Sequence, residues 1–197
     1  MKVHLFNPLE NLSGGSEWRT IELFRFLRNH ADVTIWSRRG PNPSFPEDIV
    51  AHTQTLSDDH FPMMGNFIFI GCYQHIGDWI YRSRSSRTIV IYNTDTPRKL
   101  AFVALRLPVL GPRIEIVYAS DYMKKSIGNL DGPVHPSLID LSRFTPPQSG
   151  NDFFAVGRLS RDVPEKHFQN DRFLYDALVK NDIRVEIMGG DVVIRSG

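Results

Sequence analysis

The sequence lacks most features that mark a secreted, membrane-spanning or nucleic-acid-binding protein. Cys72 is the single cysteine, so no disulfide can form within the chain, which fits a reducing compartment. Lysine and arginine number 23 against 22 aspartates and glutamates, so no strong net field attracts nucleic acid or an acidic membrane. The start of the chain turns polar at Asn7-Pro8, too early for a signal peptide or a transmembrane segment. We expect a cytoplasmic protein and leave peripheral attachment to a membrane open.

Two motifs are also missing. No Gly-x-Gly-x-x-Gly follows the first apolar run, which weighs against the usual dinucleotide-binding turn. No histidine, cysteine and aspartate cluster has the spacing of a metal site. We therefore expect no metal and no resident cofactor.

What is present is an alternation of short apolar runs and helix-length segments. The pattern predicts strands at 3–6, 33–36, 49–53 (a weak one), 66–71, 88–92 and 114–117. It predicts helices at 16–29, around 79–81, and at 99–107, with Ser16 as the N-cap of the first. Strands that alternate with helices in this way are typical of an α/β fold with a doubly wound, Rossmann-like parallel sheet. Ligands of such sheets bind at the carboxyl ends of the strands, here the loops 11–15, 71–77, 93–97 and 119–121.

The pattern restarts after a proline- and glycine-containing linker at 146–151. A strand at 153–156, a loop at 157–166, a helix at 173–179 and a strand at 184–188 follow. We divide the chain into a domain at 1–147 and the beginning of a second domain at 148–197. Two strands and one helix do not bury a core by themselves. This segment therefore completes the first sheet or the sheet of a partner, or the natural protein continues past Gly197. Self-association through the incomplete domain is a further possibility.

Two glycine-containing segments have the chemistry of phosphate binding. Gly14-Gly15 lies between the first strand and its helix, where glycine lets a ligand approach the backbone and the helix N-terminus favours an anion. A tight turn without a ligand is the alternative. Gly157 and Arg158 follow the later strand, with Lys166 in the same loop, and two cations there can neutralise a diphosphate. A solvated basic loop is the alternative.

Taken in order, these segments resemble the retaining GT-B glycosyltransferases of family 4. The resemblance rests on Gly14-Gly15-Ser16-Glu17, on 117–120, on 135–146, on Gly157-Arg158-Leu159 with Lys166, and on 187–190. It implies two Rossmann-like domains facing each other across a cleft, of which the first binds the acceptor and the second a sugar nucleotide. The implied reaction transfers a sugar, with retention, from a nucleoside diphosphate to a hydroxyl of an acceptor glycan, lipid or small molecule.

The resemblance also implies a set of site residues. Those for binding the donor or substrate are Gly14, Gly15, Gly157, Arg158, Lys166, Gly189 and Gly190. Members of the family commonly carry a histidine after the strand at 88–92, whereas this chain continues with Asn93 and Asp95. That polar role falls to one of those two residues or is absent, and His75 lies on another candidate loop. The family's paired donor-binding glutamates have no counterpart, so we do not expect this chain to catalyse transfer alone.

Two other interpretations stay open. Arg38-Arg39 directly follow the second strand, where a ribose phosphate is read in NADP-dependent oxidoreductases. The second interpretation is a non-catalytic, truncated glycosyltransferase-like binding module.

Overall fold

The computed structural model describes residues 1–72, 77–93, 97–111, 113–128, 131–138, 154–159, 168 and 170–188. The chain forms two compact units, Met1–Leu141 and Ser142–Gly197, each of which is described here by itself. The expected boundary at 147/148 lies outside the described residues.

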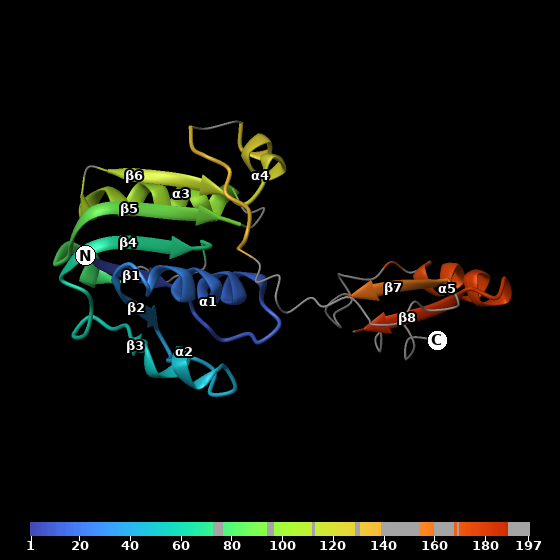
Figure 1. The fold of residues 1–197 in the computed structure, drawn as a ribbon. Helices are drawn as coiled ribbons and strands as arrows, with labels where there is room; N and C mark the ends of the chain where they lie inside the picture. The colour runs from blue at the N-terminus through green and yellow to red at the C-terminus, as the bar shows by residue number, and fades with distance from the viewer. Residues whose placement is uncertain are drawn as a thin grey trace. The chain divides into compact units, whose positions relative to one another are not determined.

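The first unit contains a six-stranded sheet (Figure 1). Its strands are β1 (Lys2–Phe6), β2 (Asp32–Ser37), β3 (Thr53–Thr55), β4 (Met64–Ile70), β5 (Arg84–Tyr92) and β6 (Ile114–Tyr118). Its helices are α1 (Gly15–Leu27), α2 (Glu47–Ala51), α3 (Pro97–Arg106) and α4 (Asp121–Ser126), with 3-10 turns η1 (Asp78–Tyr81) and η2 (Leu107–Leu110). The strand order is β3-β2-β1-β4-β5-β6, and every neighbouring pair is parallel. The expected α/β class with a Rossmann-like parallel sheet is confirmed.

The sheet is buried on both faces, as the apolar run at 66–71 suggests. Successive side chains along a strand point to opposite faces. In β4, Ile68 and Ile70 belong to one buried cluster, and Phe67 and Phe69 belong to the other. Figure 1 shows α1 across one face of the sheet and α3 across the other. Both faces therefore carry a core.

The weak strand expected at 49–53 is wrong. Residues 47–51 form α2, and strand β3 begins only at Thr53. Glu47 and Asp48 lie in the first turn of α2, where acidic side chains stabilise the positive end of a helix.

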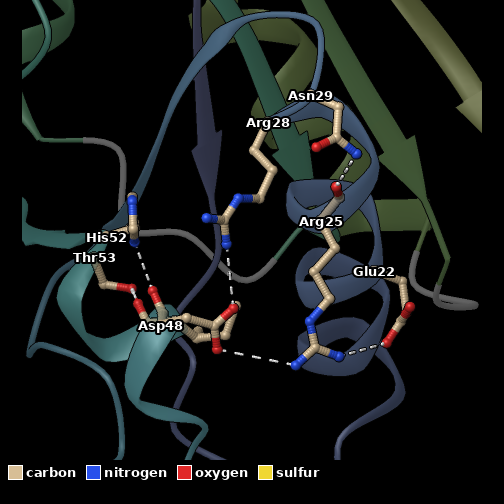
Figure 2. A network of polar contacts seen from close by, with 8 residues as sticks. Glu22, Arg25, Arg28, Asn29, Asp48, His52 and Thr53 are labelled. Carbon is tan, nitrogen blue, oxygen red and sulfur yellow. Dashed lines mark hydrogen bonds and ion pairs between the residues drawn. The ribbon is translucent and has the colours of Figure 1, made fainter.

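Polar contacts hold α2 against α1 (Figure 2). The Asp48 carboxylate lies 3.4 Å from Nη1 of Arg28 and 4.0 Å from Nη2 of Arg25. Arg25 also pairs with Glu22 one turn earlier, at 3.2 Å. The carbonyl oxygen of Asp48 is in turn 2.7 Å from Nδ1 of His52, which directly precedes β3. Residues 47–51 thus form a helix tied to α1 by Asp48, in place of the strand that the β-branched residues suggested.

Helix α1 differs from the prediction at both ends. It begins at Gly15 with Gly14 as the N-cap, so Ser16 lies inside the helix and is not its cap, and it ends at Leu27. Ile21 and Phe24 are buried as expected, whereas Trp18 is 36% exposed. The indole Nε1 of Trp18 donates to the carbonyl oxygen of Leu12 at 2.7 Å, which keeps the ring near the surface.

Short helical segments were the hardest to predict. The expected helix around 79–81 is the 3-10 turn η1, and η2 and α4 were not expected. Ser120 is the N-cap of α4, and its hydroxyl accepts from the backbone N–H of Met123 at 3.2 Å. That N-cap explains why the chain turns helical directly after β6.

The second unit contains strands β7 (Ala155–Leu159) and β8 (Arg184–Met188) with helix α5 (Asp171–Lys180) between them in the chain. The strands pair in parallel, from Ala155 opposite Arg184 to Leu159 opposite Met188. The predicted bounds of β8 are confirmed. The strand predicted to end at 156 instead extends to 159, so Gly157 and Arg158 lie in β7 and not in the loop after it.

Candidate binding site at the carboxyl edge of the sheet

The strand order reverses its direction beside β1. The chain proceeds from β1 outward through β2 to β3, and then returns to β4 on the other side of β1. In open parallel sheets, ligands bind outside the carboxyl ends of the strands at such a reversal, and the order 3-2-1-4-5-6 is that of dinucleotide-binding domains. The residues that follow β1 and β4 therefore form the candidate site.

Asn7 holds the elements around this point together. It follows β1 directly and is 1% exposed. Its side-chain amide donates to the carbonyl oxygens of Ser16 in α1, at 3.3 Å, and of Ile70 in β4, at 3.4 Å. Its Oδ1 accepts from the backbone N–H of Leu9 at 2.9 Å. The start of α1 is thus fixed relative to both central strands.

The turn after β1 is rigid and strained at one residue. Leu9 is fully buried with φ at +49°, in the left-handed region that a leucine rarely adopts. Its carbonyl oxygen accepts from the backbone N–H of Asn42, at 2.8 Å, in the segment that follows β2. The hydroxyl of Ser37, at the end of β2, donates to the carbonyl oxygen of Pro8. Surrounding contacts therefore maintain the strained conformation.

The glycine pair lies at the start of α1 as predicted, and a carboxylate lies over it. A side chain at Gly14 would overlap the Oε2 atom of Glu17, whereas nothing lies within 4 Å of where a side chain at Gly15 would begin. Glu17 is 8% exposed and accepts from the Ser16 hydroxyl at 2.6 Å. The Glu17 carboxylate therefore occupies the space in front of Gly14, where a phosphate was expected to bind.

Arg19 is a buried cation at the same edge. It is 5% exposed, and its Nη2 donates to the carbonyl oxygen of His135. The backbone N–H of His135 donates to the carbonyl oxygen of Tyr118, the last residue of β6, at 2.8 Å. The guanidinium thus connects α1 to the carboxyl end of β6. Burial lowers the pKa of Arg19 below its ordinary value.

The polar residues proposed to replace the family histidine are only partly described. Asn93 is half-buried directly after β5, at the carboxyl edge. Asp95 and His75 lie outside the described residues, and their roles stay predictions.

The donor residues of the second unit are likewise described in part. Gly157 is exposed in β7, with nothing within 4 Å of where a side chain would begin. Arg158 follows it in the strand, and its side chain is not described. Lys166, Gly189 and Gly190 lie outside the described residues.

Cys72 lies just beyond β4 at the carboxyl edge, and its surroundings argue against a role as a nucleophile. It is 6% exposed, and burial raises the pKa of its thiol to about 11. The thiolate is the reactive form, so this thiol is almost entirely unreactive at neutral pH.

No known protein family, curated protein or solved structure matches this chain. Within the described ranges, no three or more histidine, cysteine, aspartate or glutamate side chains are grouped so that they could hold a metal ion. The described part of the chain also contains no helix long and apolar enough to cross a membrane.

Sequence reasoning missed Asn7, Glu17 as a cover over Gly14, and Arg19. The sequence did contain a signal for Asn7, since a polar residue before a proline at the end of an apolar strand suggests a turn held by side-chain hydrogen bonds. Arg19 gave no signal, because an arginine on a helix is usually exposed.

Proposed function

We propose that this chain belongs to a sugar-transferring enzyme that uses a nucleoside-diphosphate sugar, as a retaining glycosyltransferase of the GT-B type. The six-stranded unit would bind the acceptor, and the unit with β7, α5 and β8 would take part in binding the donor. The observation that supports this proposal best is the order of parts along the chain. A parallel sheet of order β3-β2-β1-β4-β5-β6, with glycines at the start of α1, is followed by a separate parallel strand–helix–strand unit containing Gly157-Arg158.

The proposed chemistry needs positive charge at the leaving group. The bond from the sugar to the diphosphate breaks, a bond from the sugar to the acceptor oxygen forms, and the acceptor proton passes to a base or to the departing phosphate. Negative charge accumulates on the diphosphate, which preorganised cations stabilise. Arg158 and Lys166 are proposed for that role, and Asn93, Asp95 or His75 for polar contacts to the sugar or acceptor. The neutralising cations make a metal unnecessary in this proposal.

The test is a calorimetric binding screen of the full chain against nucleoside diphosphates and their sugars. We expect saturable binding of at least one of them, weakened about ten- to a hundredfold by Arg158→Ala, because a charge-assisted hydrogen bond contributes about 1.5–3 kcal/mol. Arg172→Ala, which removes an exposed arginine from α5, is the matched control and should leave binding unchanged. Absence of binding, or equal affinity in the Arg158 variant, would contradict the proposal.

A second candidate is an NADP-dependent oxidoreductase. The strand order is equally that of dinucleotide-binding domains, and Arg38 and Arg39 follow β2 at its carboxyl end. Arg39 is exposed, and its Nη1 is 4.0 Å from the Glu10 carboxylate. This long contact leaves the guanidinium accessible to a phosphate. The long turn from Asn7 to Gly14, without the glycine fingerprint, weighs against this candidate. Binding of NADPH but of no sugar nucleotide in the same screen would favour it.

A further inference from the structure

Arg19 presents an unusual electrostatic situation. Its side chain is 95% buried, yet no described acidic side chain forms an ion pair with it. Its Nη1 atom is buried and, within the described residues, makes no hydrogen bond. A buried charge is costly unless it is paired and hydrogen-bonded, and an unmade hydrogen bond adds to that cost. Arg19 is therefore a buried charged donor with no counter-charge and, at Nη1, no acceptor among the described residues.

The position of Arg19 directs this donor to the candidate site. Long side chains of a helix point back toward its N-terminus, so Arg19 in the second turn of α1 extends toward the first turn. Its other terminal nitrogen reaches His135, which is hydrogen-bonded to the last residue of β6. The guanidinium therefore lies at the carboxyl edge, where ligands of parallel sheets bind.

Glu17 makes the glycine turn a poor place for the same anion. Its carboxylate lies over Gly14 and carries negative charge at the start of α1. A second anion there would be repelled, while one beside Arg19 would gain a counter-charge. The carboxylate of Glu17 therefore disfavours an anionic ligand in front of Gly14, whereas the guanidinium of Arg19 favours one at its own position.

The cover over Arg19 is a surface segment. Residues 131–138 are exposed or half-buried, and a backbone carbonyl oxygen from this segment is the acceptor that Arg19 has. The segment is also held by a bridge between Val134 and Tyr118 and by a hydrogen bond from Nζ of Lys124 to the carbonyl oxygen of Gly132, at 2.8 Å. Because Nη1 of Arg19 is buried, a ligand reaches it only when the residues that cover it move.

We propose that Arg19 is a binding residue for a phosphoryl oxyanion of the substrate at the carboxyl edge, with Nη1 as the donor. The choice of phosphate over other anions rests on the proposed function, in which the ligands carry phosphate. A guanidinium matches phosphate oxygens with paired N–H groups, and phosphate supplies both the missing acceptor and the missing counter-charge. The phosphate comes from the acceptor or from the diphosphate of the donor.

The test measures the thermal stabilisation of the full chain by inorganic phosphate, at constant ionic strength set with chloride. An anion that binds only the folded state raises its unfolding temperature, by an amount that grows with the logarithm of the anion concentration once this exceeds Kd. We expect phosphate to stabilise the wild type and Arg28→Met, a control at the exposed C-cap of α1, and we expect Arg19→Met to bind phosphate about ten- to a hundredfold more weakly. Arg19→Lys, which keeps the charge without the paired donors, should fall between them.

Folding of the variant does not obscure the result. Replacing a buried, unpaired charge by an apolar side chain of similar length is often neutral or stabilising. Arg19→Met should therefore unfold, without phosphate, at the wild-type temperature or above it, while losing the phosphate effect. A variant that loses stability but keeps the phosphate effect would overturn the proposal.

The remaining outcomes separate this inference from the proposed function. Competition between phosphate and UDP in the wild type assigns the oxyanion to the donor, and simultaneous binding assigns it to the acceptor; both support the inference. Equal phosphate binding by wild type and Arg19→Met overturns it, even where nucleoside diphosphates bind through Arg158. Phosphate binding through Arg19 without any nucleotide binding supports it and rejects the proposed function.

Discussion

The two faces of the six-stranded sheet are built from different side chains. On the face covered by α1 and α2, the buried hydrophobic residues of the strands are all aliphatic: Val3, Leu5, Val33, Ile35, Ile68, Ile70 and Ile91. On the opposite face, the buried hydrophobic residues of the strands are aromatic apart from Val90: Phe6, Trp36, Phe67, Phe69, Tyr92 and Tyr118. The alternation of side chains along each strand separates the two kinds.

The coverings explain the difference. Helix α1 is regular over 13 residues and presents an apolar ridge that β-branched side chains can match. The other face is covered by α3 and by short segments that include η1 and η2, of four residues each. Large rings fill that irregular space, and Phe6 stacks between Phe69, at 4.4 Å between ring centroids, and Trp79, at 5.3 Å. We infer that stability is concentrated in a few rings on the aromatic face and spread over many small contacts on the aliphatic face.

The largest effect should follow from removing a ring on the aromatic face. Trp79→Ala should lower the free energy of unfolding by about 3–5 kcal/mol, because Trp79 is 2% exposed and its loss leaves a cavity beside Phe6. Ile21→Ala in α1, on the aliphatic face, should cost about 2–3 kcal/mol, near the lower end of such truncations. Urea unfolding monitored by circular dichroism measures both.

The control for this comparison lies in the same turn as Trp79. Tyr81 is 54% exposed, so Tyr81→Ala should change the unfolding free energy by no more than about 0.5 kcal/mol. If Ile21→Ala costs as much as Trp79→Ala, stability is not concentrated on the aromatic face.

A smaller effect concerns His4, which is buried on the aromatic face. Nε1 of Trp36 donates to Nδ1 of His4 at 3.0 Å, so the proton of the neutral ring is on Nε2, which lies 3.1 Å from the carbonyl oxygen of Met64. Protonation would put a second proton against the indole N–H. Burial lowers the pKa of His4; the hydrogen bond to Met64 and nearby Asp32 oppose this, and nearby Lys2 adds to it.

The sign of the pH effect follows from this lowered pKa. As pH falls below about 6.5, the unfolded chain binds a proton at residue 4 before the folded protein does, so stability declines until the lower pKa of the folded state is reached. Above that window His4 contributes no pH dependence. Urea midpoints between about pH 7.5 and 5.5 should therefore fall more in the wild type than in His4→Gln. Parallel pH profiles for the two proteins would show that His4 titrates as it does in the unfolded chain.

The sequence was sufficient for what local patterns determine. The short apolar runs predicted five of the six strands, and the glycine pair predicted the turn before α1. It was not sufficient where distant contacts decide. Residues 49–53 have β-branched side chains, but Asp48 bonds to α1 and the segment becomes α2.

The candidate site divides in the same way. Gly14 and Gly15 were predictable because their chemistry is local. The buried state of Arg19 depends on the carbonyl oxygen of His135, 116 residues away in sequence, and no local pattern encodes that contact. The difference between the two sheet faces is visible in β4, where aromatic and aliphatic residues alternate. Which helix covers each face depends on how the chain connects the strands.

The smallest effect concerns the two glycines at the start of α1, the helix that covers the aliphatic face. Gly14 is the N-cap of α1, and alanine is a poor N-cap, so Gly14→Ala should cost about 0.5–1 kcal/mol and must also displace the Glu17 carboxylate. Gly15 has free space and lies inside the helix, where alanine is favoured, so Gly15→Ala should be neutral or slightly stabilising. Urea unfolding of the two variants provides a matched pair, one residue apart. The pair therefore compares a position where both the N-cap and the Glu17 carboxylate are disturbed with a neighbour where neither is. Equal stabilities would mean that neither the N-cap nor the displacement of Glu17 carries a measurable cost, and the space in front of α1 would then be open to an anion after all.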